Sequence, residues 1–151
     1  DVLGSRGLGD VYKRQMLKAA FEKTYDRAFD FGTGFLEDIN GKSYKLPCIW
    51  VCPFELISKT GRSEGFRVYL GTIYLLELGD GLTAQEKDER WDAMEDAAIE
   101  VLNQLIEQSP SEIVAVDKIK DIPNEGAYTG YNDISLKVTF EVTVRYCVDR
   151  G

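Results

Sequence analysis

The C-terminal part of the sequence carries the pattern that most constrains the fold. Over residues 134–148, apolar and polar residues alternate almost without interruption, and the apolar positions are Ile134, Leu136, Val138, Phe140, Val142, Val144, Tyr146 and Val148. Because successive side chains of a β-strand point to opposite faces, this alternation predicts one strand with a buried face and a solvent-exposed face. At about 3.3 Å per residue the strand is roughly 50 Å long. It is therefore longer than one small core requires, and it must bend around that core or reach beyond it.

Three other stretches predict strands. Residues 47–54 (PCIWVCPF) form an apolar run between two prolines, which is typical of a buried strand. Residues 66–77 (FRVYLGTIYLLE) are rich in β-branched and aromatic residues, and residues 113–119 (IVAVDKI) are mostly apolar. An Asn-Gly pair within residues 35–46 predicts a small hairpin there, because both central residues of a two-residue hairpin loop need a positive φ.

Two stretches have the apolar spacing of helices. Residues 16–31 place apolar side chains near one face. Thr83 and Glu86 form a capping box, which predicts the start of a second helix that runs to about residue 108. One face of this helix is apolar, and the other carries Asp88, Glu89, Asp92, Glu95, Asp96 and Glu100. With no nucleophile or base beside them, a solvated helical face explains these acids better than catalytic pairs do.

The predicted order is helix, small hairpin, two long strands, long helix and two strands (α-β-β-β-β-α-β-β). It indicates an α+β fold, in which a mainly antiparallel β-sheet is packed on one face by an N-terminal helix and a long central helix. The chain has 151 residues, enough for one domain with a substantial core. We therefore expect a single α+β domain over residues 16–151.

The first fifteen residues (DVLGSRGLGDVYKRQ) do not fit this domain. They lack an apolar period and contain three closely spaced glycines, so the sequence predicts disorder. The stretch resembles a translated sequencing linker that recurs at the ends of unrelated reading frames assembled from metagenomic DNA. This resemblance implies a non-native leader over residues 1–15 and a native start at or near Met16.

Composition argues against several classes of function. The net charge is -8, and an acidic surface repels phosphate, so a protein that coats nucleic acid is disfavoured. The chain contains no histidine, which removes the usual general base at neutral pH and the commonest metal ligand. Cys48 and Cys52 lie roughly 13 Å apart in a strand, which is too far for a disulfide, and zinc would lack a full ligand set. We therefore expect no catalytic residues, no cofactor and no metal.

Two loops carry the candidate contact residues. Residues 55–65 predict a polar loop with Lys59 and Arg62 near its tip, which could touch phosphate or could simply be an exposed turn. Residues 121–133 predict a second long loop with Tyr128 and Tyr131, and tyrosine is enriched at protein interfaces. Loops this long are unusual between sheet strands. Arg62, Tyr128 and Tyr131 are the candidate subunit-interface residues.

The order of elements, with FRVYLGTIYLLE followed by an acidic amphipathic helix, resembles the tail-terminator or tail-completion proteins of long-tailed phages. This resemblance covers roughly residues 16–148. It implies a virion structural protein, assembled in the host bacterial cytoplasm, that forms a ring, commonly a hexamer, at the head-proximal end of the tail. Its partners would be copies of itself and the tail-tube and neck proteins. DNA would pass through an acidic lumen without specific binding, and no membrane would be involved.

Other functions remain open from the sequence. Another head–tail neck protein or a minor tail component is the nearest alternative. A cytosolic adaptor or a ligand-binding module, with a pocket between sheet and helix, belongs to a different class. An enzyme is least favoured, because the sequence shows no nucleophile motif.

Overall fold

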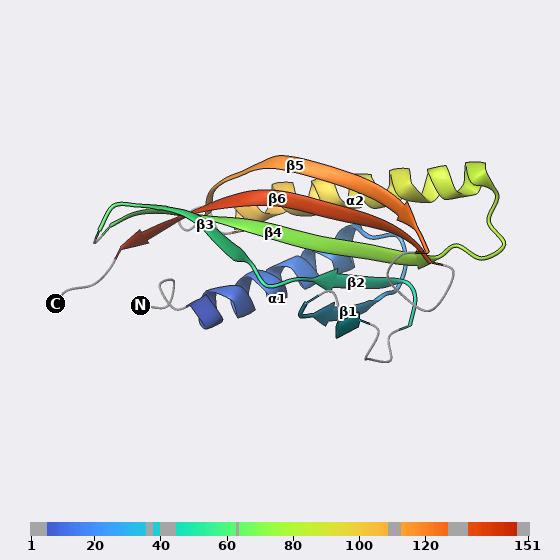
Figure 1. Cartoon of the computed structure of the whole chain (residues 1–151), viewed down its shortest axis with the longest axis horizontal. Helices are drawn as coiled ribbons and strands as arrows, with labels where there is room; N and C mark the ends of the chain where they lie inside the picture. Colours follow the sequence, from blue (N-terminus) through green and yellow to red (C-terminus); the bar gives the residue numbers. More distant parts are fainter. Residues whose placement is uncertain are drawn as a thin grey trace.

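The computed structural model describes residues 6–35, 38–39, 45–62, 64–108, 113–126 and 133–147. Within these residues, two helices and six strands follow one another (Figure 1). In chain order they are α1 (Arg6–Thr24), β1 (Asp30–Thr33), β2 (Cys48–Val51), β3 (Glu55–Thr60), β4 (Glu64–Leu78), α2 (Ala84–Gln108), β5 (Ile113–Glu125) and β6 (Asp133–Cys147). The α+β fold with an N-terminal helix and a long central helix is confirmed.

The six strands form one sheet in the order β1-β2-β4-β6-β5, and β3 also pairs with β4. The β1–β2 pair is parallel and the other pairs are antiparallel, so the sheet is mixed but mainly antiparallel. The longest pair joins β4 and β6 from Glu64↔Cys147 to Leu78↔Asp133 without a break in register. β2 and β3 lie one after the other along the opposite edge of β4, where they pair with its two halves.

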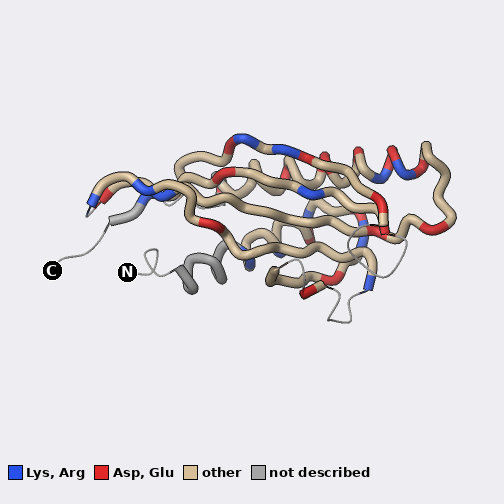
Figure 2. The backbone as a smooth tube through the Cα atoms, viewed as in Figure 1, with Lys and Arg blue, Asp and Glu red and all other residues tan. Residues whose placement is uncertain are grey.

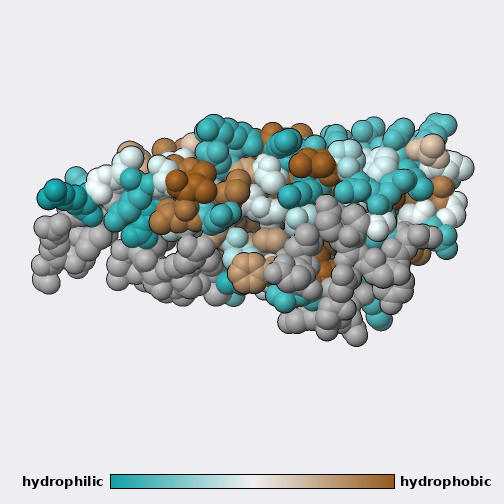
Figure 3. Space-filling view, viewed as in Figure 1, coloured by the Kyte–Doolittle hydropathy of each residue, from teal (hydrophilic) through white to brown (hydrophobic). Residues whose placement is uncertain are grey.

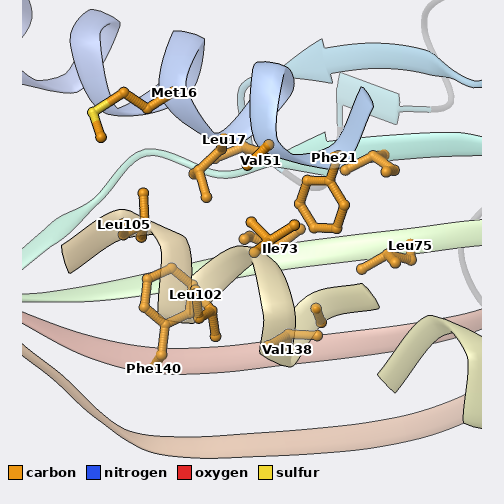
Figure 4. Packing of buried hydrophobic residues seen from close by; sticks show 14 of the residues in the cluster. Met16, Leu17, Phe21, Val51, Ile73, Leu75, Leu102, Leu105, Val138 and Phe140 are labelled. Carbon is orange, nitrogen blue, oxygen red and sulfur yellow. The ribbon is translucent and has the colours of Figure 1, made fainter. Parts of the chain in front are cut away.

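Both helices pack on the same face of the sheet, as the amphipathic patterns predict (Figure 4). The buried face predicted for β6 is confirmed, because its even-numbered apolar residues from Ile134 to Val144 are buried. They meet Leu17 and Phe21 of α1 and Leu102 and Leu105 of α2 in one core cluster. The other face of β6 is only partly exposed, since Ser135 is buried as well. The capping box of α2 is also present, since the Thr83 nitrogen donates to Glu86 Oε1 at 2.9 Å and the Glu86 nitrogen donates to Thr83 Oγ1 at 3.2 Å.

A smaller core covers part of the other face. Trp50 and Tyr74 are buried there with Ile39, Cys48 and Leu76. The Trp50 indole nitrogen donates to the Gly34 carbonyl at 2.9 Å, which joins the segment after β1 to this face of the sheet. This burial explains the apolar run at residues 47–54, because β2 has core on both of its faces.

The N-terminal segment differs from the sequence prediction at both of its ends. The helix begins at Arg6, whereas the sequence predicted disorder over residues 1–15. It ends at Thr24 rather than near residue 31, because Phe29 folds back onto Phe21 and Tyr25, with ring centroids 6.5 and 5.6 Å apart. Residues 30–33 form β1. That residues 1–15 are non-native stays a prediction.

Two predicted loops contain strand. Residues 55–60 form β3, so the polar loop expected over residues 55–65 is a tight hairpin turn between β3 and β4. β5 continues to Glu125, which shortens the loop expected over residues 121–133. The Asn-Gly turn of the hairpin predicted over residues 35–46 lies outside the described residues, and Asp38 and Ile39 of that segment are not in a strand.

A close contact at the centre of the sheet makes the core testable. A Cβ added at Gly71 would lie 2.4 Å from Phe140 Cζ and 2.8 Å from Phe54 Cε1, and both rings are fully buried. We expect Gly71→Ala to destabilise the protein by about 1–3 kcal/mol, because the packed core must move to accept one methyl group. In a Phe140→Leu background the cost should fall by at least about 0.5 kcal/mol. Denaturant unfolding of the single and double variants measures this, and strictly additive costs would contradict the contact.

Candidate interaction surface

Three strands project past the helices at one end of the molecule (Figure 1). We call this projection the arm. It consists of β3, residues 64–67 of β4 and residues 145–147 of β6, which are held together by the antiparallel pairing of β4 with both neighbours. Tyr69, Val142 and Val144, at the base of the arm, still belong to the core under the helices. The arm contains the part of β6 that is longer than the core requires, and the long alternating stretch of the sequence predicted this extra length.

The turn at the tip of the arm depends on two glycines. Gly61 has a φ of +82°, and a Cβ at this position would lie 2.0 Å from the Glu64 carbonyl oxygen. A Cβ at Gly65 would lie 2.0 Å from the Thr60 carbonyl oxygen. At either position, any residue other than glycine would require a shift of the backbone. Arg62 stands on this turn and is exposed, so the structure places this candidate interface residue at the tip of the arm.

The arm exposes apolar side chains that the rest of the fold does not cover. All six residues of β3 are exposed, and Leu56 and Ile57 have exposed fractions of 43% and 46%. Phe66, on the neighbouring strand, is 39% exposed. Figure 3 shows hydrophobic atoms gathered where β3 runs along the arm. Large apolar residues that cluster on a surface are typical of an interaction site.

Two of the edge strands, β5 and β3, differ in how they protect their edges. β5 carries the devices that discourage pairing with another strand: Pro123, the charged residues Asp117, Lys118 and Lys120, and a bulge at Lys118, whose φ is +53°. β3 also has a register shift, between Leu56 and Ser58, and two charged residues, Glu55 and Lys59, but it contains no proline and its middle is apolar. The arm is therefore the less protected of these two edges.

A cluster of charged residues around one buried carboxylate lies at the other end of β4. Glu77 is fully buried and accepts two hydrogen bonds from Arg90, from Nε to Oε1 and from Nη2 to Oε2, each at 2.7 Å. The Tyr25 hydroxyl donates to Glu77 Oε2, and Arg27 Nη1 donates to Oε1 at 3.3 Å. Arg90 also donates from Nη1 and Nη2 to Asp26 at 2.8 and 3.0 Å.

This cluster serves as a clamp between α1, β4 and α2. Each Glu77 oxygen already accepts two hydrogen bonds, so the carboxylate is held in place rather than offered to a substrate. The hydrogen bond to Glu77 raises the pKa of Arg90, and the hydrogen bond from Arg90 lowers the pKa of Asp26. Burial, reinforced by Glu77, raises the pKa of Tyr25. All of these shifts stabilise the protonation states that the clamp needs.

A hollow of about 470 Å³ adjoins the clamp. Its described lining comes from α1 and the loop after it, with Lys18, Glu22 and Arg27 among the charged residues. Two smaller hollows lined by described residues lie between helix and sheet, one of about 250 Å³ between α1 and β1, and one of about 290 Å³ beside Lys87 of α2 and Glu125 of β5. Within the described ranges, no group of three or more histidine, cysteine or acidic side chains could hold a metal ion. Burial raises the pKa of the Cys48 thiol to about 12, as for a core cysteine.

Comparisons with known proteins add no assignment. The sequence matches no protein-family model, and a search of curated proteins finds no match either. Neither helix described by the structure is long and apolar enough to cross a membrane.

The candidate residues have different outcomes. Arg62 lies on the arm, and Tyr128 and Tyr131 lie outside the described residues. The proposed interface role of all three residues stays a prediction. Sequence reasoning missed the clamp, although two signals were available. Glu77 lies two and four residues from buried Leu75 and Ile73 on the same face of β4, and Arg90 lies one helical turn before buried Met94. A charge at a core-facing position predicts a buried partner.

The clamp predicts a large effect of breaking one buried ion pair. Arg90→Met leaves the buried Glu77 carboxylate without its main partner, so we expect a loss of about 3–5 kcal/mol in the free energy of unfolding. Lys87→Met is the matched control on the same helix, because it breaks the exposed Lys87–Glu125 pair and should cost about 0–1 kcal/mol. Urea unfolding measures both variants. Equal losses in their free energy of unfolding would show that the buried Glu77 carboxylate does not depend on Arg90 for its stability.

A second prediction concerns the acids between β5 and α2. Burial raises the pKa of Asp121, whose Oδ1 has no hydrogen-bond partner in the described structure. Burial raises the pKa of Glu95, and the charges of Asp121, Asp92 and Asp96 raise it further. The folded pKa of Asp121 lies above the unfolded value of about 3.9. Ionisation of this carboxyl therefore lowers the free energy of unfolding as the pH rises from the unfolded pKa through the folded pKa.

Asp121→Asn should therefore raise the melting temperature at pH 7, and the gain should disappear as the pH falls below about 4. Thermal unfolding followed by circular dichroism from pH 3.5 to 8 measures this. Asp117→Asn, which is exposed on the same strand, is the control. A gain that is independent of pH would point to a cause other than the charge.

Proposed function

We propose that this protein is a structural subunit that assembles with copies of itself into a ring, and that it acts as a tail terminator or tail-completion protein at the head-proximal end of a phage tail. The arm is the observation that supports self-assembly, because its exposed apolar residues and weakly protected edge need a partner surface. The order of elements supports the place in the virion, through its resemblance to that class.

The charge of the chain fits a passage for DNA. A net charge of -8 disfavours contacts with phosphate, so DNA would move past the ring without being held. The clamp fits this proposal as well, because it gives the subunit a rigid body from which the arm extends. A neck protein or a minor tail component would use the same kind of ring at another level of the virion.

Assembly can be measured directly. Light scattering and negative-stain microscopy at tens of micromolar should show closed rings of a single size. Leu56→Ser/Ile57→Ser should abolish them, because it removes the exposed apolar surface of the arm. The control is Val114→Ser, which changes an apolar residue of similar exposure (42%) on β5. Rings that persist in the arm variant would remove the support that the arm gives to the proposal.

The tail assignment needs its own test. Mixed with the cognate tail-tube protein, the wild-type chain should limit the length of the tubes and add density at their ends. The arm variant should leave tube length unchanged. If tubes grew to the same lengths with and without the wild-type chain, and no density capped them, the tail-terminator assignment would be wrong even for a protein that forms rings.

A further inference from the structure

Charge is distributed unevenly along the long axis of the molecule (Figure 2). The outer part of the arm carries the basic residues Lys59, Arg62, Arg67 and Arg145 against the single acid Glu64. Phe66 lies directly opposite Arg145 in the β4–β6 register, so basic and apolar side chains share this surface. A partner for the arm must therefore offer both negative charge and apolar contact.

A surface of that kind exists on α2 of the same protein. Asp88, Asp92, Asp96 and Ile99 are spaced by four, four and three residues, so they form one stripe along the helix, and all four are exposed. We call these residues the acidic stripe. Ile99 has an exposed fraction of 43%, comparable with that of Leu56 on the arm.

The basic residues of α2 do not neutralise the acidic stripe. Lys87 pairs with Glu125 of β5 at 2.9 Å, and Arg90 is held by Glu77 and Asp26. Among the described residues, none of the three aspartates of the stripe takes part in an ion pair. The raised pKa of nearby Glu95, caused first by burial and then by Asp121, Asp92 and Asp96, reports the negative potential on this side of the helix.

We infer that the arm of one subunit docks on the acidic stripe of a second copy of this chain. Arg62 and Arg145 would face Asp92 and Asp96, while Phe66, which shares the face of Arg145, would cover Ile99. The inference rests on the proposed self-assembly, and it names the two surfaces that meet.

The positions of the two surfaces determine the kind of assembly. The arm and the N-terminal half of α2, which carries the three aspartates of the stripe, lie at opposite ends of the molecule (Figure 1). A contact between two different surfaces is heterologous, and each added subunit leaves one arm and one stripe unoccupied. Repetition of this contact closes into a ring when the rotation between subunits divides a full turn, and otherwise it gives a filament. A head-to-tail contact is therefore compatible with a ring, which a two-fold contact alone cannot form.

Charge reversal tests the contact in the full chain. The arm variant is Arg62→Glu/Arg145→Glu, and the stripe variant is Asp92→Lys/Asp96→Lys. Each should raise the concentration needed for half-assembly by about tenfold or more, because attraction becomes repulsion. The chain that carries all four changes should assemble within about threefold of wild type, because the reversed surfaces attract again. Sedimentation velocity over a range of concentrations at low salt measures all four proteins.

Matched controls separate this contact from a general effect of charge. Lys120→Glu changes an exposed charge on β5, and Glu107→Lys changes an exposed charge near the far end of α2. Both should assemble as wild type does. Raising the salt concentration should weaken wild-type assembly, since the Debye length falls to about 3 Å at 1 M ionic strength.

The outcomes distinguish the contact from the proposed function. If wild-type rings form and both reversals leave them unchanged, or if the fourfold variant is not restored, the arm–stripe contact is wrong while the ring stands. If reversal and restoration occur but the wild type forms only short chains or filaments that do not cap tubes, the contact is supported and the ring function fails. A wild-type chain that stays monomeric at every concentration and salt overturns both.

Discussion

The unbroken pairing of β4 with β6 is the contact on which the rest of the structure depends. Fifteen residues of each strand pair in one register, from Glu64↔Cys147 to Leu78↔Asp133. Because side chains alternate between faces, this register decides which residues of both strands meet the helices, and a slip of one residue would place every apolar residue of β6 on the solvent side. Phe140 can occupy the centre of the core only because Gly71 lies opposite it and leaves room for its ring. The remaining strands extend a sheet whose two faces this pair has already defined.

The same register explains why a charged cluster lies inside the fold. Glu77 pairs with Ile134, so its side chain points to the face that the helices cover. A buried carboxylate needs compensating charge and hydrogen bonds. Arg90 supplies both, because it stands one turn before Met94 on the side of α2 that faces the sheet. Asp26 then binds the outer edge of the guanidinium, which joins the end of α1 to the start of α2. The clamp therefore fixes how both helices sit on one end of β4, and the other end is left to form the arm.

Much of this fold could be predicted from the sequence. The features that could not be predicted share one physical cause. The alternation of β6 and the capping box of α2 were visible because their signals are local: a period of two, and a pair of side chains three residues apart. β3 was not visible, because its residues (ELISKT) are polar enough for a loop and become a strand only through the edge that β4 offers them. The early end of α1 was missed for a similar reason, since Phe29 turns back to pack on Phe21 and Tyr25. Arg62 was identified as exposed, but its position on a projecting arm depends on β3 being a strand.

The length of the β4–β6 pair links the fold to assembly. At the clamp end the pair is covered by helices and secured by buried charge, whereas at the arm end the same strands continue past the helices (Figure 1). A strand pair that served only the core could end where the helices end. Here the extension is kept rigid by three-stranded pairing and by a turn that only glycine fits, and it carries apolar and basic residues that the subunit itself does not cover. The region of uncompensated acid on α2 lies at the far end of the same molecule. The two surfaces have complementary charge and lie too far apart to meet within one chain, so the register that builds the core also presents the surface that the proposed assembly would use.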